Sequence, residues 1–457
     1  MNIKEAKKVY FLGIGGIGIS GLAKICQWQG KQVSGSDLAE SELTDNLKEA
    51  NIPVFIGQKA ENVPKDADLY VYSAAVPENN PEREQIKKLG KQDKEINYFQ
   101  AVGQLMKDYE YCIAISGTHG KTTTTAMLAS ILIEDGSDPT VIVGSMIKQL
   151  NSNSRLGKNK KYFVVEACEH KEHMMNLSPN AIVLTNIEED HLDYYRDLEH
   201  IQITFQNYIN KLPKHGILVK NNDDSESKEL GCDSKVITYG IKNRAHVMAK
   251  KIRKEKLLQK FSVGKTPFTL QIPGDFNIYN ALSVIALARE LGIPDNTIKK
   301  ALKEFAGTWR RFEQVGSFKG ATVISDYAHH PTAVAATIKA AREFYPGRRI
   351  VVLFQPHQHN RTKRLFEGFT KCFKDADLIM IHEIFDVAGR EESKDQDVTS
   401  ADLVKAVEKT GKYVFHSDSF EKAQQLLHEH VEKNDVLLIL GAGDIYKVAL
   451  SICSPSR

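Results

Sequence analysis

A glycine-rich stretch near residue 120 constrains the fold of this chain more than any other part of the sequence. Residues 113–116 form an apolar run rich in isoleucine, which is typical of a buried strand. Two glycines, Gly117 and Gly120, then bracket a tight loop ahead of Lys121 and Thr122, and apolar residues follow with helical spacing. This arrangement can hold a polyphosphate, because backbone N–H groups and a helix N-terminus face the anion. We therefore expect Lys121 to contact the outer phosphates and the Thr122 hydroxyl to bind Mg²⁺.

The composition is that of a globular protein of more than one domain. With 457 residues the chain is too long for one ordinary core, which predicts two to three domains. The formal charge of +3 and the lack of a long basic run give no support for a nucleic-acid partner. The six cysteines are scattered, and there is neither a signal-peptide pattern nor an apolar run long enough to span a bilayer. We expect a cytoplasmic protein with no membrane partner.

A second glycine turn lies near the N-terminus. The apolar strand 9–12 leads into a G-x-G-x-x-G turn at residues 13–18, and Asp37 follows about 20 positions later. This pattern is that of the dinucleotide fingerprint. The glycines report that the backbone approaches a pyrophosphate, but they do not report which nucleotide carries it, and a simple strand–helix turn has the same pattern. A third strand, 69–72, delivers Ser73 at its carboxyl end.

The middle of the chain alternates strands and helices, and its strands end in polar residues. The strand 162–165 delivers Glu166, and the strand 181–185 delivers Asn186 and then His191. Carboxyl ends of parallel strands meet at one sheet edge, so Glu166 and His191 are both candidate ligands for a metal beside Lys121. The alternatives are a capping or surface carboxylate for Glu166 and a solvated loop histidine for His191.

The last third of the chain also alternates strands and helices. Asn277 and Asn280 are three residues apart and share one helical face, where they could cap the helix or read a base edge. Histidines gather in the loops 326–332 and 355–364, but they lack carboxylate or cysteine partners at ligand spacing, so we expect no zinc site there. The predicted fold class is α/β with three domains: a Rossmann-like domain at 1–107, a central P-loop-type ATPase domain with a mostly parallel sheet at 108–312, and a Rossmann-like domain at 313–457.

Taken together, these motifs resemble the Mur ligases of peptidoglycan synthesis. The resemblance covers the whole chain in order and spacing. It rests on Gly-Thr-His-Gly-Lys-Thr-Thr-Thr at 117–124, Glu166, Thr-Asn-Ile-x-x-Asp-His at 185–191, Asn277-x-x-Asn280, Arg-Arg-Phe at 310–312 and Asp-Tyr-Ala-His-His-Pro-Thr at 326–332. The glycine turn and Ser-Gly-Ser-Asp at 34–37 are most similar to the member that acts first in the series.

The resemblance implies a reaction and its substrates. It implies ATP-dependent ligation of L-alanine to the lactyl carboxylate of UDP-N-acetylmuramate through an acyl phosphate, with Mg²⁺, by a monomer or weak homodimer. The implied catalytic residues are Lys121, His191 and Arg361, and the implied metal ligands are Thr122, Glu166 and His191. For ATP it implies Gly117, Thr118, Gly120, Lys121, Thr122, Thr123, Asn277, Asn280, Arg311 and Asp326. For the other substrates it implies Gly15, Gly16, Gly18, Ser36, Asp37, Ser73, His119, His357 and Arg361.

Two alternatives stay open at this point. In the loop 355–362 the family pattern has an arginine where this chain has Gln358, while Arg361 is present. The recycling branch of the family, which attaches a whole tripeptide to UDP-N-acetylmuramate, shares the histidine signature at 326–332 and is the nearest alternative. An NAD-dependent oxidoreductase fused to a phosphate-loop module is the other, and it leaves the motifs from 166 to 332 unexplained.

Overall fold

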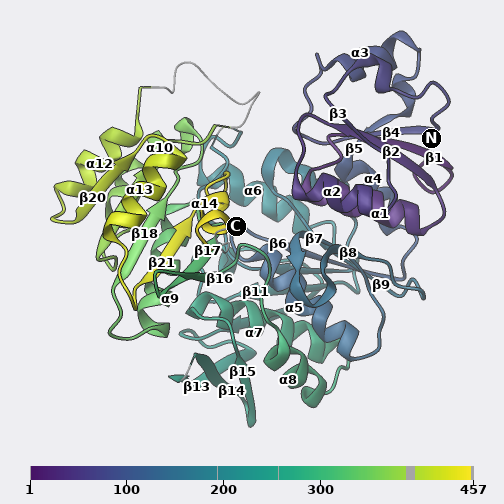
Figure 1. Cartoon of the computed structure of the whole chain (residues 1–457). Coiled ribbons are helices and arrows are strands. Elements are labelled where there is room, and N and C mark those ends of the chain that lie inside the picture. Colours follow the sequence, from purple (N-terminus) through teal and green to yellow (C-terminus); the bar gives the residue numbers. More distant parts are fainter. Residues whose placement is uncertain (1, 193, 256, 387–396, 454–457) are drawn as a thin grey trace. The chain divides into compact units, whose positions relative to one another are not determined.

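Five parallel strands close to the N-terminus form the first sheet, in the order β3-β2-β1-β4-β5 (Figure 1). The structure of the chain is a computed structural model, which describes residues 2–192, 194–255, 257–386 and 397–453. The order is that of a doubly wound nucleotide-binding fold, whose ligands bind at the carboxyl ends of the strands. Its elements are β1 (Lys8–Leu12), α1 (Ile17–Trp28), β2 (Gln32–Asp37), α2 (Glu42–Glu49), β3 (Val54–Ile56), β4 (Leu69–Tyr72), α3 (Pro81–Lys88), β5 (Glu95–Asn97) and α4 (Tyr98–Met106).

The central sheet runs in the order β12-β11-β10-β6-β9-β7-β8, and all neighbours are parallel except β7 and β8. Residues 113–115 of β6 are fully buried, as expected for a strand covered on both faces. The elements are β6 (Tyr111–Ser116), α5 (Lys121–Glu134), β7 (Thr140–Ile147), β8 (Ser152–Arg155), β9 (Tyr162–Glu166), β10 (Ala181–Leu184), α6 (Leu198–Ile209), β11 (Ile217–Asn221) and β12 (Lys235–Gly240).

An antiparallel extension and two helices follow the central sheet in sequence. Strand β13 (Val247–Glu255) begins parallel to β12 and then pairs antiparallel with β14 (Leu258–Val263), which pairs with β15 (Thr266–Leu270). The helices are α7 (Asp275–Glu290) and α8 (Asp295–Glu304).

The C-terminal sheet runs in the order β16-β17-β21-β18-β19-β20, and only β16 is antiparallel to its neighbour. Apolar residues of its strands enter a separate buried cluster on each face. The elements are β16 (Glu313–Phe318), β17 (Ala321–Asp326), α9 (Pro331–Phe344), β18 (Ile350–Phe354), α10 (His359–Arg364), α11 (Phe366–Lys371), β19 (Leu378–His382), α12 (Ser400–Glu408), β20 (Tyr413–Ser417), α13 (Phe420–His430), β21 (Val436–Leu440) and α14 (Tyr446–Cys453).

The predicted fold class is confirmed: the chain is α/β, with a Rossmann-like sheet at each end and a mostly parallel sheet between them in sequence. The described chain divides into two compact units. The first holds residues 1–190, 197–248 and 280–302, and the second holds 191–196, 249–279 and 303–457. The three-domain boundaries at 107 and 312 stay a prediction. None of the described helices is long and apolar enough to cross a lipid bilayer.

Candidate active site

The glycine loop between β6 and α5 has the backbone shape that the sequence predicts. Gly117 and Gly120 have φ angles of 127° and 84°, in the region that favours glycine, and Gly120 is the N-cap of α5. A Cβ on Gly117 would overlap the hydroxyl of Thr185. A Cβ on Gly120 would lie 2.5 Å from Asn280 Oδ1, which places the second asparagine of the predicted pair beside the loop.

The segment that follows β10 holds this loop in place. The backbone N–H of Thr118 donates to Asn186 O at 2.9 Å, and that of His119 donates to Asn186 Oδ1 at 2.9 Å. The Thr185 hydroxyl donates to His119 O at 2.6 Å, and His119 Nε2 lies 2.8 Å from Glu188 Oε2. The Thr-Asn motif therefore fixes the loop from its far side.

Lys121 is paired with a carboxylate that sequence reasoning missed. Its Nζ donates to Glu169 Oε2 at 2.9 Å and to Glu169 Oε1 at 3.0 Å, and also to the carbonyl oxygens of Gly117 and Thr118. Burial is the largest single influence and lowers the pKa of Lys121, but the charge and hydrogen bonds of Glu169 and the other negative groups nearby together outweigh it, so the pKa is raised. Lys121 is therefore a cation at neutral pH.

Thr122 and Glu166 form an oxygen-rich corner next to Lys121. The Thr122 hydroxyl donates to Glu166 Oε2 at 3.2 Å, and the backbone N–H of Gly144 donates to Glu166 Oε1 at 2.5 Å. A Cβ on Gly144 would lie 2.7 Å from Glu166 Oε2, so glycine makes room for the carboxylate. A hydroxyl and a carboxylate are hard oxygen donors, which are the ligands Mg²⁺ prefers. The residues present fit that ion.

The N-terminal glycine turn is closed by the end of β2. The N–H of Gly15 donates to Asp37 Oδ2 at 2.8 Å, and Ser36 O accepts from Gly13 N at 2.9 Å. A Cβ on Gly18 would lie 2.8 Å from the hydroxyl of Tyr98, a residue of α4 that no sequence pattern singles out. Burial, and then the charge of Glu166, raise the pKa of Tyr98.

Ser36 and Ser73 both lie at this turn, in different settings. Ser36 is fully buried, and its hydroxyl donates to Glu82 Oε2 at 2.5 Å. Ser73 follows β4, and its Cβ lies 3.1 Å from where a Cβ on Gly13 would stand. Ser36 thus supports the turn from inside the sheet, while Ser73 packs against its glycines.

In the second unit, Asp326 clusters with the buried Arg310 and the half-buried Arg311. The Arg310 guanidinium donates to Gly443 O at 2.8 Å and lies 4.4 Å from the ring centre of Tyr446. Asp326 accepts from the N–H groups that follow Arg311 and Tyr327 in the chain, each at 2.7 Å. Burial raises the pKa of Asp326, and the positive charge of Arg311 opposes that rise. Arg310 therefore has a structural role. The guanidinium carbon of Arg311 lies 4.8 Å from the ring centre of Tyr327.

The start of α10 brings His357, Gln358 and Arg361 together. Arg361 Nη1 lies 3.2 Å from His357 Nδ1 and donates to Gln358 Oε1 at 3.1 Å. Gln358 has a φ of 69°, so the turn itself aims this side chain. Gln358, which departs from the family pattern, thus contacts Arg361, which matches it.

The predicted site residues fall in both units. The first unit brings together the glycine loop, Glu166, Asn280 and the N-terminal turn, and the second holds His191, Asn277, Arg311, Asp326, His357 and Arg361. Glu169, Glu188 and Tyr98 also lie at the site but are not among the predicted residues. Glu169 comes three residues after Glu166 at the end of β9, which was a usable signal, whereas the position of Tyr98 depends on tertiary packing alone.

Three family models match consecutive parts of the chain. They are the Mur ligase family catalytic domain at 8–110, the Mur ligase middle domain at 115–288 and the Mur ligase glutamate ligase domain at 310–443. A protein of Clostridium tetani named UDP-N-acetylmuramate–L-alanine ligase is 41% identical over 454 residues, covering 97% of each chain. A protein of the same name from Alkaliphilus metalliredigens is 40% identical over 460 residues, covering 98% of this chain and 97% of its own.

Solved structures agree with these matches. The UDP-N-acetylmuramate–alanine ligase of Thermotoga maritima has a TM-score of 0.82 at 29% identity, covering 97% of this chain and 98% of its own. A murein peptide ligase of Psychrobacter arcticus shares the fold, with a TM-score of 0.72 at 22% identity over 98% of this chain and 99% of its own. This chain therefore belongs to the Mur ligase family, whose models match it from residue 8 to residue 443.

Proposed function

We propose that this chain joins L-alanine to the lactyl carboxylate of UDP-N-acetylmuramate at the expense of ATP, in the synthesis of peptidoglycan precursors. The observation that carries the proposal is the convergence of Lys121, Thr122 and Glu166 on one phosphate-binding loop. The name shared by the near-full-length relatives supports the choice of substrates.

ATP would bind with its phosphates on the glycine loop. Lys121 would neutralise the transferring phosphoryl group, and Asn280, which lies beside Gly120, would read the adenine together with Asn277. Thr122 and Glu166 would hold Mg²⁺, with His191 as a ligand of a second ion. When bound, Mg²⁺ withdraws charge from the phosphate oxygens. Arg311 and Asp326 would contact phosphate and ribose.

The other two substrates would bind at the remaining predicted residues. The N–H groups of Gly15, Gly16 and Gly18 would receive the pyrophosphate of the UDP-sugar, with Ser36, Asp37, Ser73 and His119 around it. His357 and Arg361 would orient L-alanine. Because Gln358 contacts Arg361, its amide would set the direction of the guanidinium toward the amino-acid carboxylate.

The chemistry follows from these positions. The carboxylate of the sugar attacks the γ-phosphorus, the bond to ADP breaks, and an acyl phosphate forms. The amine of L-alanine then attacks the acyl carbon and loses a proton, phosphate leaves, and an amide remains. Phosphoryl transfer depends mainly on positioning and charge stabilisation, which Lys121 and the loop N–H groups would supply. An acyl phosphate must be kept from water, so we expect the site to close before chemistry.

We further propose three domains at 1–107, 108–312 and 313–457 and a monomer or weak homodimer. We place the protein in the cytoplasm, since its six cysteines are all unpaired and a reducing compartment keeps thiols in that state. Sedimentation at several protein concentrations tests the oligomeric state.

Phosphate release tests the proposed activity. With UDP-N-acetylmuramate, ATP and Mg²⁺, we expect turnover with free L-alanine and none with the L-Ala-γ-D-Glu-diamino acid tripeptide. Lys121→Ala should lower kcat on the order of 10²–10³-fold, as the loss of one charge-stabilising donor does in other enzymes. Lys107→Ala, an exposed lysine outside the loop, is the matched control. Turnover with the tripeptide alone would move the protein to the recycling reaction.

A further inference from the structure

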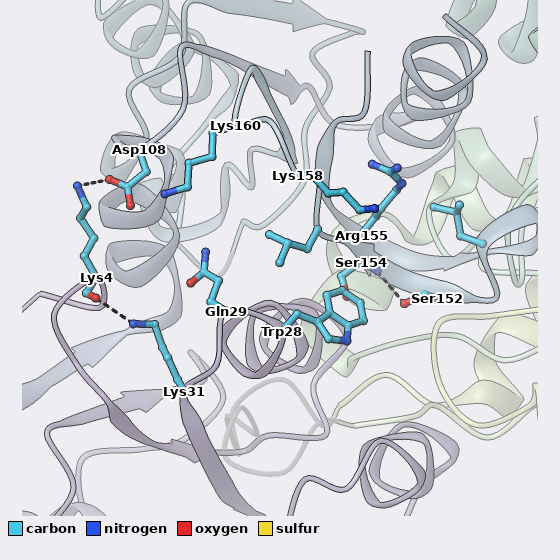
Figure 2. A pocket seen from close by; sticks show the side chains of 13 residues that line it. Lys4, Trp28, Gln29, Lys31, Asp108, Ser152, Ser154, Arg155, Lys158 and Lys160 are labelled. Atoms are coloured by element: carbon cyan, nitrogen blue, oxygen red, sulfur yellow. Dashed lines mark hydrogen bonds and ion pairs between the residues drawn. The ribbon is translucent and has the colours of Figure 1, made fainter. Parts of the chain in front are cut away.

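A cavity of about 1020 Å³ lies in the first unit, away from the glycine loops. We call it the basic groove. Its walls carry four lysines and one arginine against a single aspartate. Figure 2 shows the cations on two sides of Gln29 and Trp28: Lys4, Lys31 and Lys160 on the left, and Arg155 and Lys158 on the right. The other lining residues are Asp108, Leu150, Ser152, Ser154, Leu156 and Gly157.

Most of this positive charge is not neutralised within the groove. Lys4 pairs with Asp108, and Arg155 pairs with Asp138, which does not line the groove. Lys31 donates to two carbonyl oxygens, Lys4 O at 2.9 Å and Ala6 O at 2.8 Å. Within the described residues, Lys31, Lys158 and Lys160 form no ion pair. Three ammonium groups around one cavity attract a ligand with several negative charges.

Two further side chains indicate more than an anion. Trp28 is 46% exposed at the end of α1 and lines the groove, so a planar ring can reach its indole. Ser154 is only 2% exposed, yet within the described chain its hydroxyl has no hydrogen-bond partner although it lines the groove. A buried hydroxyl without a partner is costly, and a polar ligand atom would satisfy it.

The groove joins two segments of the chain. Lys4, Trp28 and Lys31 come from the N-terminal sheet and its first helix, and residues 150–160 come from the edge of the central sheet. The same edge binds α1 directly, since Asn153 Nδ2 donates to Ser20 Oγ at 2.8 Å and Asn153 Oδ1 accepts from Lys24 Nζ at 3.3 Å. Because α1 begins at the N-terminal glycine turn, a ligand in the groove would act on the far end of the helix that supports this turn.

We propose that the basic groove is a second nucleotide site, which binds a nucleoside diphosphate with its ring on Trp28 and its phosphates among Lys31, Lys158 and Lys160. All four residues differ from those assigned above to the ligase reaction, so the groove is a separate site. Base–aromatic stacking explains the exposed indole, and the lysines and Ser154 supply the donors that a diphosphate needs.

Tryptophan fluorescence provides a local test, because the chain has two tryptophans and Trp28 is the one in the groove. In a Trp309→Phe background, titration with UDP or ADP should quench Trp28 saturably, and inorganic pyrophosphate should bind at least several-fold more weakly because it lacks a ring. The same background with Trp28→Phe reports any residual signal.

Charge variants complete the test. Lys158 and Lys160 are exposed, so the double variant Lys158→Ala/Lys160→Ala should fold, and its Kd for UDP at Trp28 should rise on the order of tenfold. Lys161→Ala, next in sequence but not lining the groove, should leave that Kd unchanged. Three results would overturn the proposal: no quenching of Trp28, an unchanged Kd in the double variant, or equal affinity for pyrophosphate and UDP.

Discussion

Lys121 Nζ lies 2.9 Å from Glu169 Oε2, so the lysine of the phosphate loop carries its own counter-ion. Both side chains are largely removed from water, with exposed fractions of 17% and 4%. Such a pair holds the ammonium group charged and in place, which prepares the loop for an anion.

Removing this counter-ion should destabilise the fold. In Glu169→Gln the ammonium group of Lys121 loses its charged partner. We expect the free energy of unfolding to fall by about 2–4 kcal/mol, somewhat less than for a wholly buried pair because Lys121 is 17% exposed. Urea unfolding at pH 7 measures this change. Glu110→Gln, an exposed glutamate just before β6, is the control and should be neutral. An unchanged midpoint in Glu169→Gln would show that the pair contributes nothing.

The Thr122–Glu166 corner predicts a change in the demand for Mg²⁺. Glu166→Gln replaces a charged ligand with a neutral one, so the Mg²⁺ concentration for half-maximal activity should rise by at least about tenfold. Thr122→Val should act in the same direction, whereas Thr122→Ser keeps the hydroxyl and should stay close to the wild type. A magnesium titration of phosphate release decides this, and equal curves for all four proteins would refute the metal assignment.

The two ends of α5 allow a matched comparison of glycines. Gly120 and Gly136 have φ angles of 84° and 74°, but only at Gly120 would an added Cβ meet a neighbour, with Asn280 Oδ1 at 2.5 Å. Each alanine variant should lose about 1–2 kcal/mol of stability from the left-handed backbone. Only Gly120→Ala should also raise the KM for ATP, which steady-state kinetics would reveal. A similar KM for ATP in both variants would show that Asn280 is not part of the nucleotide site.

Glu82 makes stability depend on pH. It is fully buried, it accepts from Ser36, Tyr10 and Asn62, and burial raises its pKa above the unfolded value. The folded chain therefore binds the proton more tightly, so this stabilisation is complete below the unfolded pKa and is lost as the pH rises through the folded pKa. Glu82→Gln should remove that dependence. The free energy of unfolding of the variant, relative to that of the wild type, should therefore be higher at pH 8 than at pH 4.5. Glu84→Gln, exposed on the same helix, should follow the wild type in urea unfolding at both pH values.

Local patterns predicted the shape of the glycine loop. The strand, loop and helix around Lys121 are local in sequence, and so is the delivery of Glu166 by β9, because each depends on spacing within one element. The pairing of Lys121 with Glu169 joins two elements and could be guessed only from the nearness of Glu169 to the end of that strand. The hydroxyl of Ser36 shows the limit: it donates to Glu82, which lies 46 residues away, and no local pattern predicts that contact.

The fold was predictable for a similar reason. Apolar runs ending in polar residues indicate parallel strands, and the three sheets follow from them. The strand β5, three residues long and only half-buried, escaped notice because it has too few residues to show a pattern. The contact of Tyr98 with the glycine turn depends on how α4 packs, which no periodicity records.

Asn153 has a practical consequence for anyone who wishes to work with a fragment. Its side chain forms hydrogen bonds with three residues of α1, at Ile17, Ser20 and Lys24, from the edge of the central sheet. A recombinant fragment that ends at residue 107 would lack Asn153, so α1 would lose these hydrogen bonds. Lys24, which is buried in the whole chain, would then be exposed to solvent. A protease that nicks the native protein should accordingly leave the N-terminal sheet attached to β8, and a stable fragment for spectroscopy would need to extend past Arg155.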